Sequence, residues 1–216
     1  MIFNRAALML LLMAFWACSK DAPLPEPDPA LPPSVPANQY LQLSPGNAWV
    51  YQSRNINLQT GDTLLLSKLD SIHVASDTFI DRALYHVQKG TRLGAAFESV
   101  LRVSGPEAVD TSGQLYFSTQ INKSNFSVPH SLLPENAQSA TGSIDQGPIL
   151  TTPYGSYSTR AYAMEVSLYP PDGQNTPEIR YDTLFFAQDV GLLRYVQHHP
   201  GHDLRVEMDL LRAYLR

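Results

Sequence analysis

The sequence has a single cysteine, Cys18, among its 216 residues. An intramolecular disulfide is therefore impossible, and we expect the fold to depend on its buried core alone. Basic residues are also few: fifteen lysines and arginines stand against twenty aspartates and glutamates, which gives a formal net charge of −5. They form no basic cluster, so we expect no nucleic acid partner.

Catalytic signatures are missing as well. The stretch YGSYS at residues 154–158 lacks the second glycine of the Gly-x-Ser-x-Gly turn that presents a nucleophilic serine. The sequence also has no phosphate-binding loop, no dinucleotide fingerprint and no His-Glu-x-x-His pair. We therefore predict a protein that is not an enzyme and that carries no cofactor.

Apolar runs are short. The run at residues 6–17 contains twelve residues, whereas a membrane-spanning helix needs about 20. Arg5 precedes this run and the small residue Ala17 ends it, which is typical of a secretory signal peptide. We predict a signal peptide at residues 1–17, with Cys18 as the first residue of the mature protein.

The residues around this point carry a family resemblance. The sequence FWAC at residues 15–18 resembles the lipobox of bacterial lipoproteins, which implies that Cys18 carries acyl chains such as palmitate. The following SKD at residues 19–21 is similar to the surface-export signal of Bacteroidetes-type lipoproteins. The resemblance implies a protein anchored by lipid to the outer membrane and exposed at the cell surface. The alternative is an ordinary signal peptide.

Proline marks the next segment, which connects the anchor to the rest of the chain. Residues 22–36 contain seven prolines in fifteen positions, a composition that favours an extended polyproline II spacer. At about 3.1 Å per residue, this spacer would reach up to about 45 Å. We assign residues 18–37 to the lipidated N-terminus and linker.

Residues 38–216 alternate between apolar and polar positions, with turns rich in Gly, Pro, Asn and Asp. This pattern predicts a single all-β domain of about nine or ten antiparallel strands, arranged as a curved sheet, an open barrel or a sandwich. Residues 68–70 interrupt the alternation of the second strand and predict a bend there. Residues 122–153 predict a long irregular crossing with at most one short strand. The strands are expected at residues 49–56, 63–75, 84–88, 97–103, 115–121, 157–168, 179–186, 192–197 and 204–210.

Two further stretches are similar to paired signatures of uncharacterised β-rich bacterial lipoproteins. They are GNAWVY at residues 46–51 and FFAQDVGLLR at residues 185–194. The resemblance implies no catalytic residue. We interpret Trp49 and Tyr51 as core or rim aromatics of a first strand, and Gly191 as a turn residue that requires positive φ.

The densest group of potential metal ligands is HHPGHD at residues 198–203. Three imidazoles and a carboxylate suit zinc or copper. However, Pro-Gly in the middle is typical of an exposed hairpin tip rather than of a rigid metal site. We therefore predict exposed turn histidines and no metal.

Three functional classes remain open. The first, which we favour, is a non-catalytic binding module that contacts other envelope proteins or a glycan. The second is a carrier that holds an apolar ligand, such as an acyl chain, in a curved sheet. The third is an extracytoplasmic hydrolase. A large apolar cavity would favour the carrier, and convergent carboxylates or a supported histidine would favour the hydrolase.

Overall fold

The computed structural model describes residues 35–169, 177–198 and 202–216. The predicted signal peptide, Cys18 and nearly all of the proline-rich linker lie outside these ranges. No helix within the described ranges has the length and apolar character needed to cross a bilayer.

One antiparallel sheet of twelve strands contains most of the described residues. Its first six strands are β1 (Ala48–Asn57), β2 (Thr63–Ile80), β3 (Ala83–Arg92), β4 (Ala95–Ser104), β5 (Glu107–Val109) and β6 (Leu115–Ser118). The last six are β7 (Lys123–Ser127), β8 (Ala137–Thr152), β9 (Gly155–Leu168), β10 (Glu178–Ala187), β11 (Gly191–His198) and β12 (Leu204–Tyr214). Two short turns of helix accompany them, α2 (Asn38–Leu41) and the 3-10 turn η1 (His130–Leu132).

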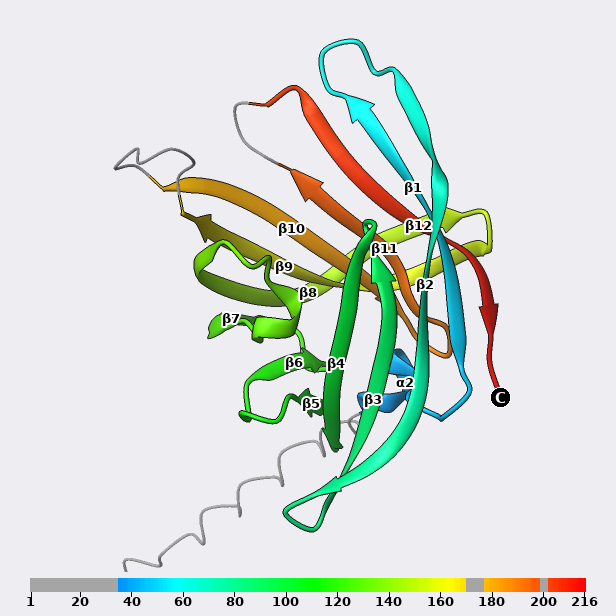
Figure 1. The fold of residues 1–216 in the computed structure, drawn as a ribbon, viewed down its shortest axis with the longest axis vertical. Helices are drawn as coiled ribbons and strands as arrows, with labels where there is room; N and C mark the ends of the chain where they lie inside the picture. The colour runs from blue at the N-terminus through cyan, green and yellow to red at the C-terminus, as the bar shows by residue number, and fades with distance from the viewer. Residues whose placement is uncertain (1–34, 170–176, 199–201) are drawn as a thin grey trace, which may run out of the picture. The chain divides into compact units, whose positions relative to one another are not determined.

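The strands follow one another as two meanders. The order in the sheet is β6-β5-β4-β3-β2-β1-β12-β11-β10-β9-β8-β7, so the meanders join where β1 pairs with β12. The sheet curls until its two edges, β6 and β7, lie on the same side (Figure 1). Lys123 of β7 forms an ion pair with Glu107 of β5 across the remaining gap. The predicted curved sheet is therefore confirmed, and it is a nearly closed barrel rather than a sandwich.

Large side chains from alternate strand positions fill the inside of this curved sheet. On β9, Tyr162, Met164, Val166 and Leu168 all point inward and are buried, as the period-two pattern predicted. The short turn α2 (Asn38–Leu41) covers one end of the barrel (Figure 1) and buries its own Tyr40 and Leu41. The ring of Tyr40 contacts Phe117 at a centroid distance of 5.4 Å, and Phe117 contacts Phe186 at 4.8 Å.

Two local features mark the middle of the first meander. The register between β1 and β2 shifts where Gln52 pairs with Leu69 and Arg54 pairs with Leu65, so the predicted bend near residues 68–70 is confirmed. On β3, Gly90 has φ of +153°, and a Cβ atom built there would lie only 1.8 Å from the carbonyl oxygen of Ser71. Glycine is required at this position because two backbones approach each other closely.

The prediction of nine or ten strands was wrong, because the sheet has twelve, and residues 122–153 contain two strands rather than an irregular crossing with one short strand. The strands it omitted are β5, β7 and β8. β5 has three residues, too few to show a period. β8 has sixteen residues, of which only Gly142, Ile144 and Thr152 are buried. Its backbone pairs with β9 along nearly its full length, so hydrogen bonds hold it without an alternating apolar face.

Candidate functional site

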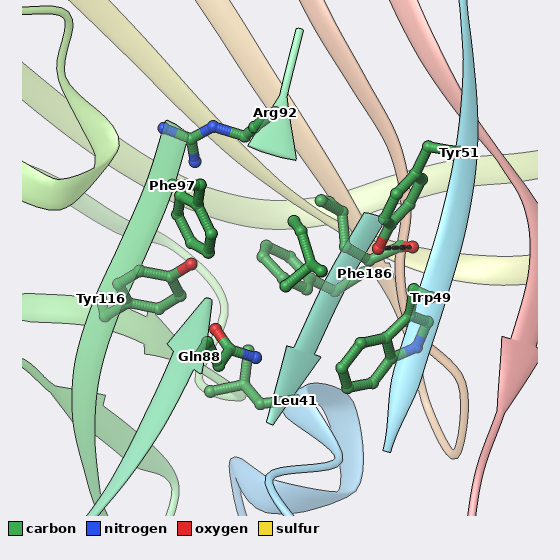
Figure 2. A pocket seen from close by; sticks show the side chains of 10 residues that line it. Leu41, Trp49, Tyr51, Gln88, Arg92, Phe97, Tyr116 and Phe186 are labelled. Carbon is green, nitrogen blue, oxygen red and sulfur yellow. Dashed lines mark hydrogen bonds between the residues drawn. The ribbon is translucent and has the colours of Figure 1, made fainter. Parts of the chain in front are cut away.

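The interior of the barrel is filled at the end that α2 covers. The space left there is a cavity of about 20 Å³ lined by aromatic and aliphatic side chains such as Trp49, Tyr51 and Phe186 (Figure 2). A cavity of this size has room for about one water molecule. This part of the interior is therefore packed core rather than a binding space for an acyl chain.

A larger recess of about 570 Å³ lies where the turn between β3 and β4 meets η1 and strands β10 and β11. Its volume falls in the range of small-molecule sites, about 300–1,000 Å³. We call it the arginine recess. The side chains discussed below line it together with aliphatic neighbours; they are Arg92, Ala95, Phe97, Glu98, His130, Ser131, Glu135, Arg180, Tyr195 and Gln197.

Arg92 is the last residue of β3 and points into the recess. Its guanidinium carbon lies 4.7 Å from the ring centroid of Phe97 (Figure 2) and 5.2 Å from that of Tyr195. Both rings offer the negative face that attracts a cation. Its Nη2 donates to the carbonyl oxygen of Ser131 at 3.2 Å. Within the described ranges, no carboxylate forms an ion pair with Arg92.

Arg180 and Asp182 form the second charged feature of this region. They are two residues apart on β10, so both point inward. Arg180 Nη2 lies 2.5 Å from Asp182 Oδ2, and the two side chains are 7% and 0% exposed. The Tyr195 hydroxyl donates to the same oxygen at 2.7 Å, and Gln197 Nε2 donates to that hydroxyl at 2.8 Å. Asp182 thus compensates the charge of Arg180.

Two donors of the recess are buried without a partner among the described residues. They are the Nε of Arg180 and the Oγ of Ser131. Buried polar groups usually find a hydrogen-bond partner in the protein or in water. Both residues, Ser131 of η1 and Arg180 of β10, line the recess together with Arg92.

Burial keeps the nearby phenols neutral. The pKa of Tyr195 is raised above its ordinary value, first by desolvation and then by the charge of Asp182, while Arg92 and Arg180 act in the opposite direction. Desolvation also raises the pKa of Tyr51 and of Tyr116, and the charge of Arg92 again opposes it. These hydroxyls remain donors at neutral pH, and the positive field of Arg92 reaches all three.

Two acidic groups near the recess have other partners, while Glu135, which also lines it, is exposed. Asp70, which is buried on β2, accepts hydrogen bonds from Ser53 Oγ at 3.1 Å and from the Gly94 amide at 2.9 Å. Glu98 lies 3.4 Å from Lys89 in an exposed pair. The recess therefore contains one compensated arginine, Arg180, and one arginine without a direct counter-charge, Arg92.

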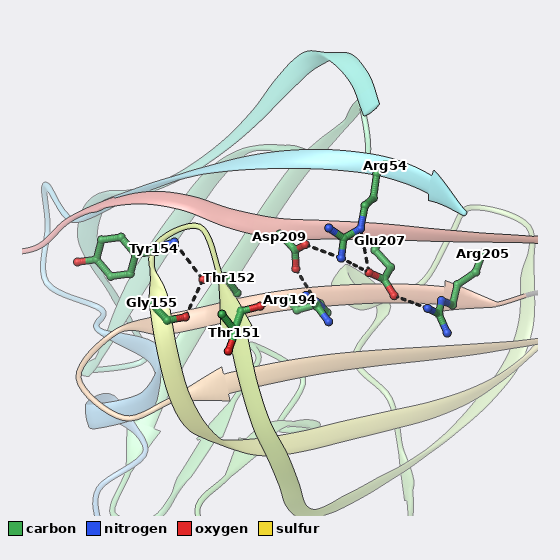
Figure 3. Close-up of polar contacts among 9 residues, drawn as sticks. All are labelled: Arg54, Thr151, Thr152, Tyr154, Gly155, Arg194, Arg205, Glu207 and Asp209. Carbon is green, nitrogen blue, oxygen red and sulfur yellow. Dashed lines mark hydrogen bonds and ion pairs between the residues drawn. The ribbon is translucent and has the colours of Figure 1, made fainter. Parts of the chain in front are cut away.

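A second cluster of charges lies on the outer face of the sheet and is fully paired (Figure 3). Glu207 lies 2.5 Å from Arg54 and 2.9 Å from Arg205. Asp209 lies 2.9 Å from Arg54 and 2.5 Å from Arg194. The β8–β9 hairpin contacts this cluster, since Arg194 Nη2 donates to the Thr151 carbonyl oxygen at 3.4 Å. Each carboxylate meets two arginines, so we interpret the cluster as structural.

The paired signatures of the sequence meet in the structure. Trp49 and Tyr51 are buried on β1, and Trp49 Nε1 donates to the Val190 carbonyl oxygen at 2.7 Å. Gly191 has φ of +107°, and a Cβ atom there would lie 2.9 Å from Trp49 Nε1. The structural interpretation of these three residues is confirmed.

The histidine-rich segment is only partly described. His198 ends β11, residues 199–201 lie outside the described ranges, and His202 is exposed with its Nε2 3.5 Å from Glu178. No group of three or more potential metal ligands occurs among the residues that the structure describes. The prediction of exposed turn histidines without a metal stays a prediction.

Sequence reasoning did not find the arginine recess. Arg92, Ser131 and Arg180 come from three distant segments, and an arginine in a polar stretch usually indicates solvent exposure. One signal was available. Arg180 and Asp182 occupy the same parity as the apolar Leu184 and Phe186 on β10, which places both charges on the inward face.

Comparisons with known proteins give a limited result. No protein-family model matches the chain, and no curated protein matches it either. One similar solved structure is from Bacteroides fragilis NCTC 9343, provisionally described as an exported protein with a YmcC-like fold. It is 12% identical with a TM-score of 0.46, over 81% of this chain and 98% of that chain. Another, from Parabacteroides distasonis ATCC 8503, is provisionally described as a lipoprotein. It is 13% identical with a TM-score of 0.47, and the match covers 82% of this chain and 98% of that chain.

Proposed function

We propose that this protein is a non-catalytic binding module of the cell envelope, which is anchored by lipid at Cys18 and holds a small ligand in the arginine recess. The observation that carries the binding proposal is the recess of about 570 Å³ beside a core whose own cavity is about 20 Å³. A filled core gives the barrel rigidity, and the recess supplies concave space with charged, aromatic and aliphatic walls.

The same geometry favours this proposal over the other two classes. A carrier of acyl chains needs a large apolar cavity, whereas arginines and polar side chains line much of this recess. A hydrolase needs a supported base beside its nucleophile. Histidine–carboxylate pairs among the described residues are His86–Asp77 at 2.7 Å and His202–Glu178 at 3.5 Å, and neither pair lines the recess.

The binding proposal is tested by filling the recess. Ala95 is exposed, lies on β4 and lines the recess, so Ala95→Trp should block it without disturbing the core. Immobilised full-length protein is incubated with an envelope extract, and the retained small molecules are identified by mass spectrometry. We expect a compound that wild type retains and Ala95→Trp does not. Ala75→Trp, at an exposed position of β2 outside the recess lining, is the matched control. No difference among the three proteins would overturn the proposal.

The localisation is proposed from the sequence alone. A Cys18→Ser variant should lose labelling by radioactive palmitate, because the thiol that carries the acyl chain is gone. Continued labelling would contradict the anchor. Replacing Lys20 and Asp21 by alanine should protect the protein from protease added to whole cells, while the palmitate label remains. Unchanged digestion would refute only the surface exposure.

A further inference from the structure

We infer that the arginine recess recognises an oxyanion, a carboxylate or a phosphate group of its ligand, and that Arg92 is the residue that binds it. This inference rests on the proposed function, because it names the chemistry of the ligand that the recess would hold. It follows from the charges, the unused donors and the apolar walls of the recess.

The first step is the charge of Arg92. A partly buried cation is stable when a counter-charge or strong acceptors replace its lost hydration. Several other arginines of the fold follow this rule: Asp182 pairs with Arg180, and Glu207 and Asp209 pair with the outer arginines. Arg92 has two aromatic rings and one carbonyl oxygen instead. The group that completes its environment is an anion.

The second step is the geometry of the guanidinium. Its planar fork matches the two oxygens of a carboxylate or phosphate, and such bidentate contacts are stronger than neutral hydrogen bonds. Phe97 and Tyr195 contact this fork with their rings, and the Ser131 carbonyl oxygen accepts a hydrogen bond from one of its N–H groups. The remaining N–H groups keep a fixed orientation, which lowers the entropic cost of binding.

The third step is the presence of further donors in the same recess. Arg180 Nε and Ser131 Oγ are buried and have no partner among the described residues. Both can donate to an oxyanion that Arg92 holds. Glu98 and Glu135 also line the recess and would oppose an anion, but Glu98 is 58% exposed and pairs with Lys89.

The recess also has an apolar wall. Leu93, Leu132 and Leu133 line it beside the charged groups. An organic body attached to the oxyanion would contact this wall, which matches the mixed character of small-molecule sites. The ligand class is therefore a small organic acid or phosphate ester rather than a neutral lipid.

The test measures whether anions stabilise the protein through Arg92. The full-length protein in detergent is melted while Trp49 fluorescence is recorded, with sodium phosphate, sodium acetate or tetramethylammonium chloride at constant ionic strength. A probe at about ten times its Kd should raise the Tm by about 3–5 °C. We expect this rise with phosphate, acetate or both, and the responsive probe identifies the oxyanion. Arg92→Met should lose the rise.

Controls separate this effect from general salt stabilisation, since phosphate strengthens apolar burial in any protein. Arg212→Met removes an arginine from an exposed position of β12 outside the recess lining and should respond as wild type does. If Arg92→Met fails to fold, Ser131→Ala provides the test and should weaken binding of the responsive probe at least threefold. Equal Tm rises in wild type and in the folded recess variant, or a specific rise with tetramethylammonium alone, would overturn the inference. A neutral compound retained by wild type and lost in Ala95→Trp would overturn the oxyanion while leaving the proposed function intact.

Discussion

Replacing Asp182 by alanine should destabilise the protein strongly. Asp182 is fully buried, pairs with Arg180 at 2.5 Å and accepts the Tyr195 hydroxyl at 2.7 Å. The substitution leaves Arg180, whose side chain is 7% exposed, without its counter-charge. Removing one partner of a buried pair costs about 3–5 kcal/mol, because the other charge stays buried. We therefore expect the free energy of unfolding to fall by about 3–5 kcal/mol, a large share of the roughly 5–15 kcal/mol of a typical domain.

The double variant Asp182→Leu with Arg180→Met separates the burial of charge from the loss of packing. Apolar residues of similar volume often replace a buried ion pair with no loss of stability. The Tyr195 hydroxyl still loses its acceptor, at a cost of about 1–3 kcal/mol. The double variant should therefore be more stable than Asp182→Ala, although it lacks both charges.

Urea unfolding followed by Trp49 fluorescence measures these free energies, because Trp49 is buried and the second tryptophan, Trp16, lies in the predicted signal peptide. The matched control is Glu98→Ala, which removes one partner of the Lys89–Glu98 pair, with side chains 50% and 58% exposed. It should cost no more than about 1 kcal/mol. An equally small cost for Asp182→Ala, or a double variant less stable than the single one, would refute the reasoning about buried charge.

Two further predictions concern pH and backbone geometry. Burial raises the pKa of four tyrosines, Tyr51, Tyr116, Tyr162 and Tyr195. Above about pH 10 the unfolded chain loses these protons and the folded chain keeps them, so stability should fall by up to about 5 kcal/mol per pH unit; tyrosinate absorbance that reaches the value for all eleven tyrosines before the protein unfolds would contradict this. Gly90→Ala should prevent folding or lower the free energy of unfolding by more than about 4 kcal/mol, because the new Cβ would meet the Ser71 carbonyl oxygen. Urea unfolding compares it with Gly61→Ala, whose Cβ would lie in open space; equal losses would show that the close approach is not the cause.

The sequence predicted those strands in which apolar and polar residues alternate. The inward face of β9 and the aromatics of β1 alternate because they enter a packed core. β8 was missed because a strand held mainly by backbone pairing needs no alternation, and its exposed positions carry Ser, Thr and Gln. β5 was missed because three residues cannot show a period. The bend of β2 was predicted because charged residues interrupt its apolar alternation near residues 68–70, where the pairing with β1 shifts register.

The candidate site was out of reach for a different reason. Its donors come from β3, η1 and β10, and their proximity depends on how far the sheet curls, which no local pattern specifies. An arginine in a strand has the same appearance in the sequence whether it faces solvent or a recess. Arg54 on the outer face and Arg92 on the inner face show this: both occur among polar neighbours, and only the register of the strands separates them.

The position of the Arg180–Asp182 pair connects the stability of the barrel to its proposed function. Asp182 is opposite Met164 and Arg180 is opposite Val166 on β9, so the pair lies within the inward face, where apolar packing gives way to the polar recess. The Oδ2 atom of Asp182 accepts the Tyr195 hydroxyl and also pairs with Arg180. Because Asp182 already compensates Arg180, the positive charge left over in the recess is that of Arg92. A variant that loses Asp182 would therefore place a second uncompensated arginine beside the first. In any Asp182 variant that still folds, such as Asp182→Asn, the recess should bind the responsive oxyanion more tightly while the protein becomes less stable. Two arginines of the recess could bind one anionic ligand, but the Asp182 carboxylate already pairs with one of them. Removing that carboxylate should therefore raise the affinity for the anion and lower the stability of the protein.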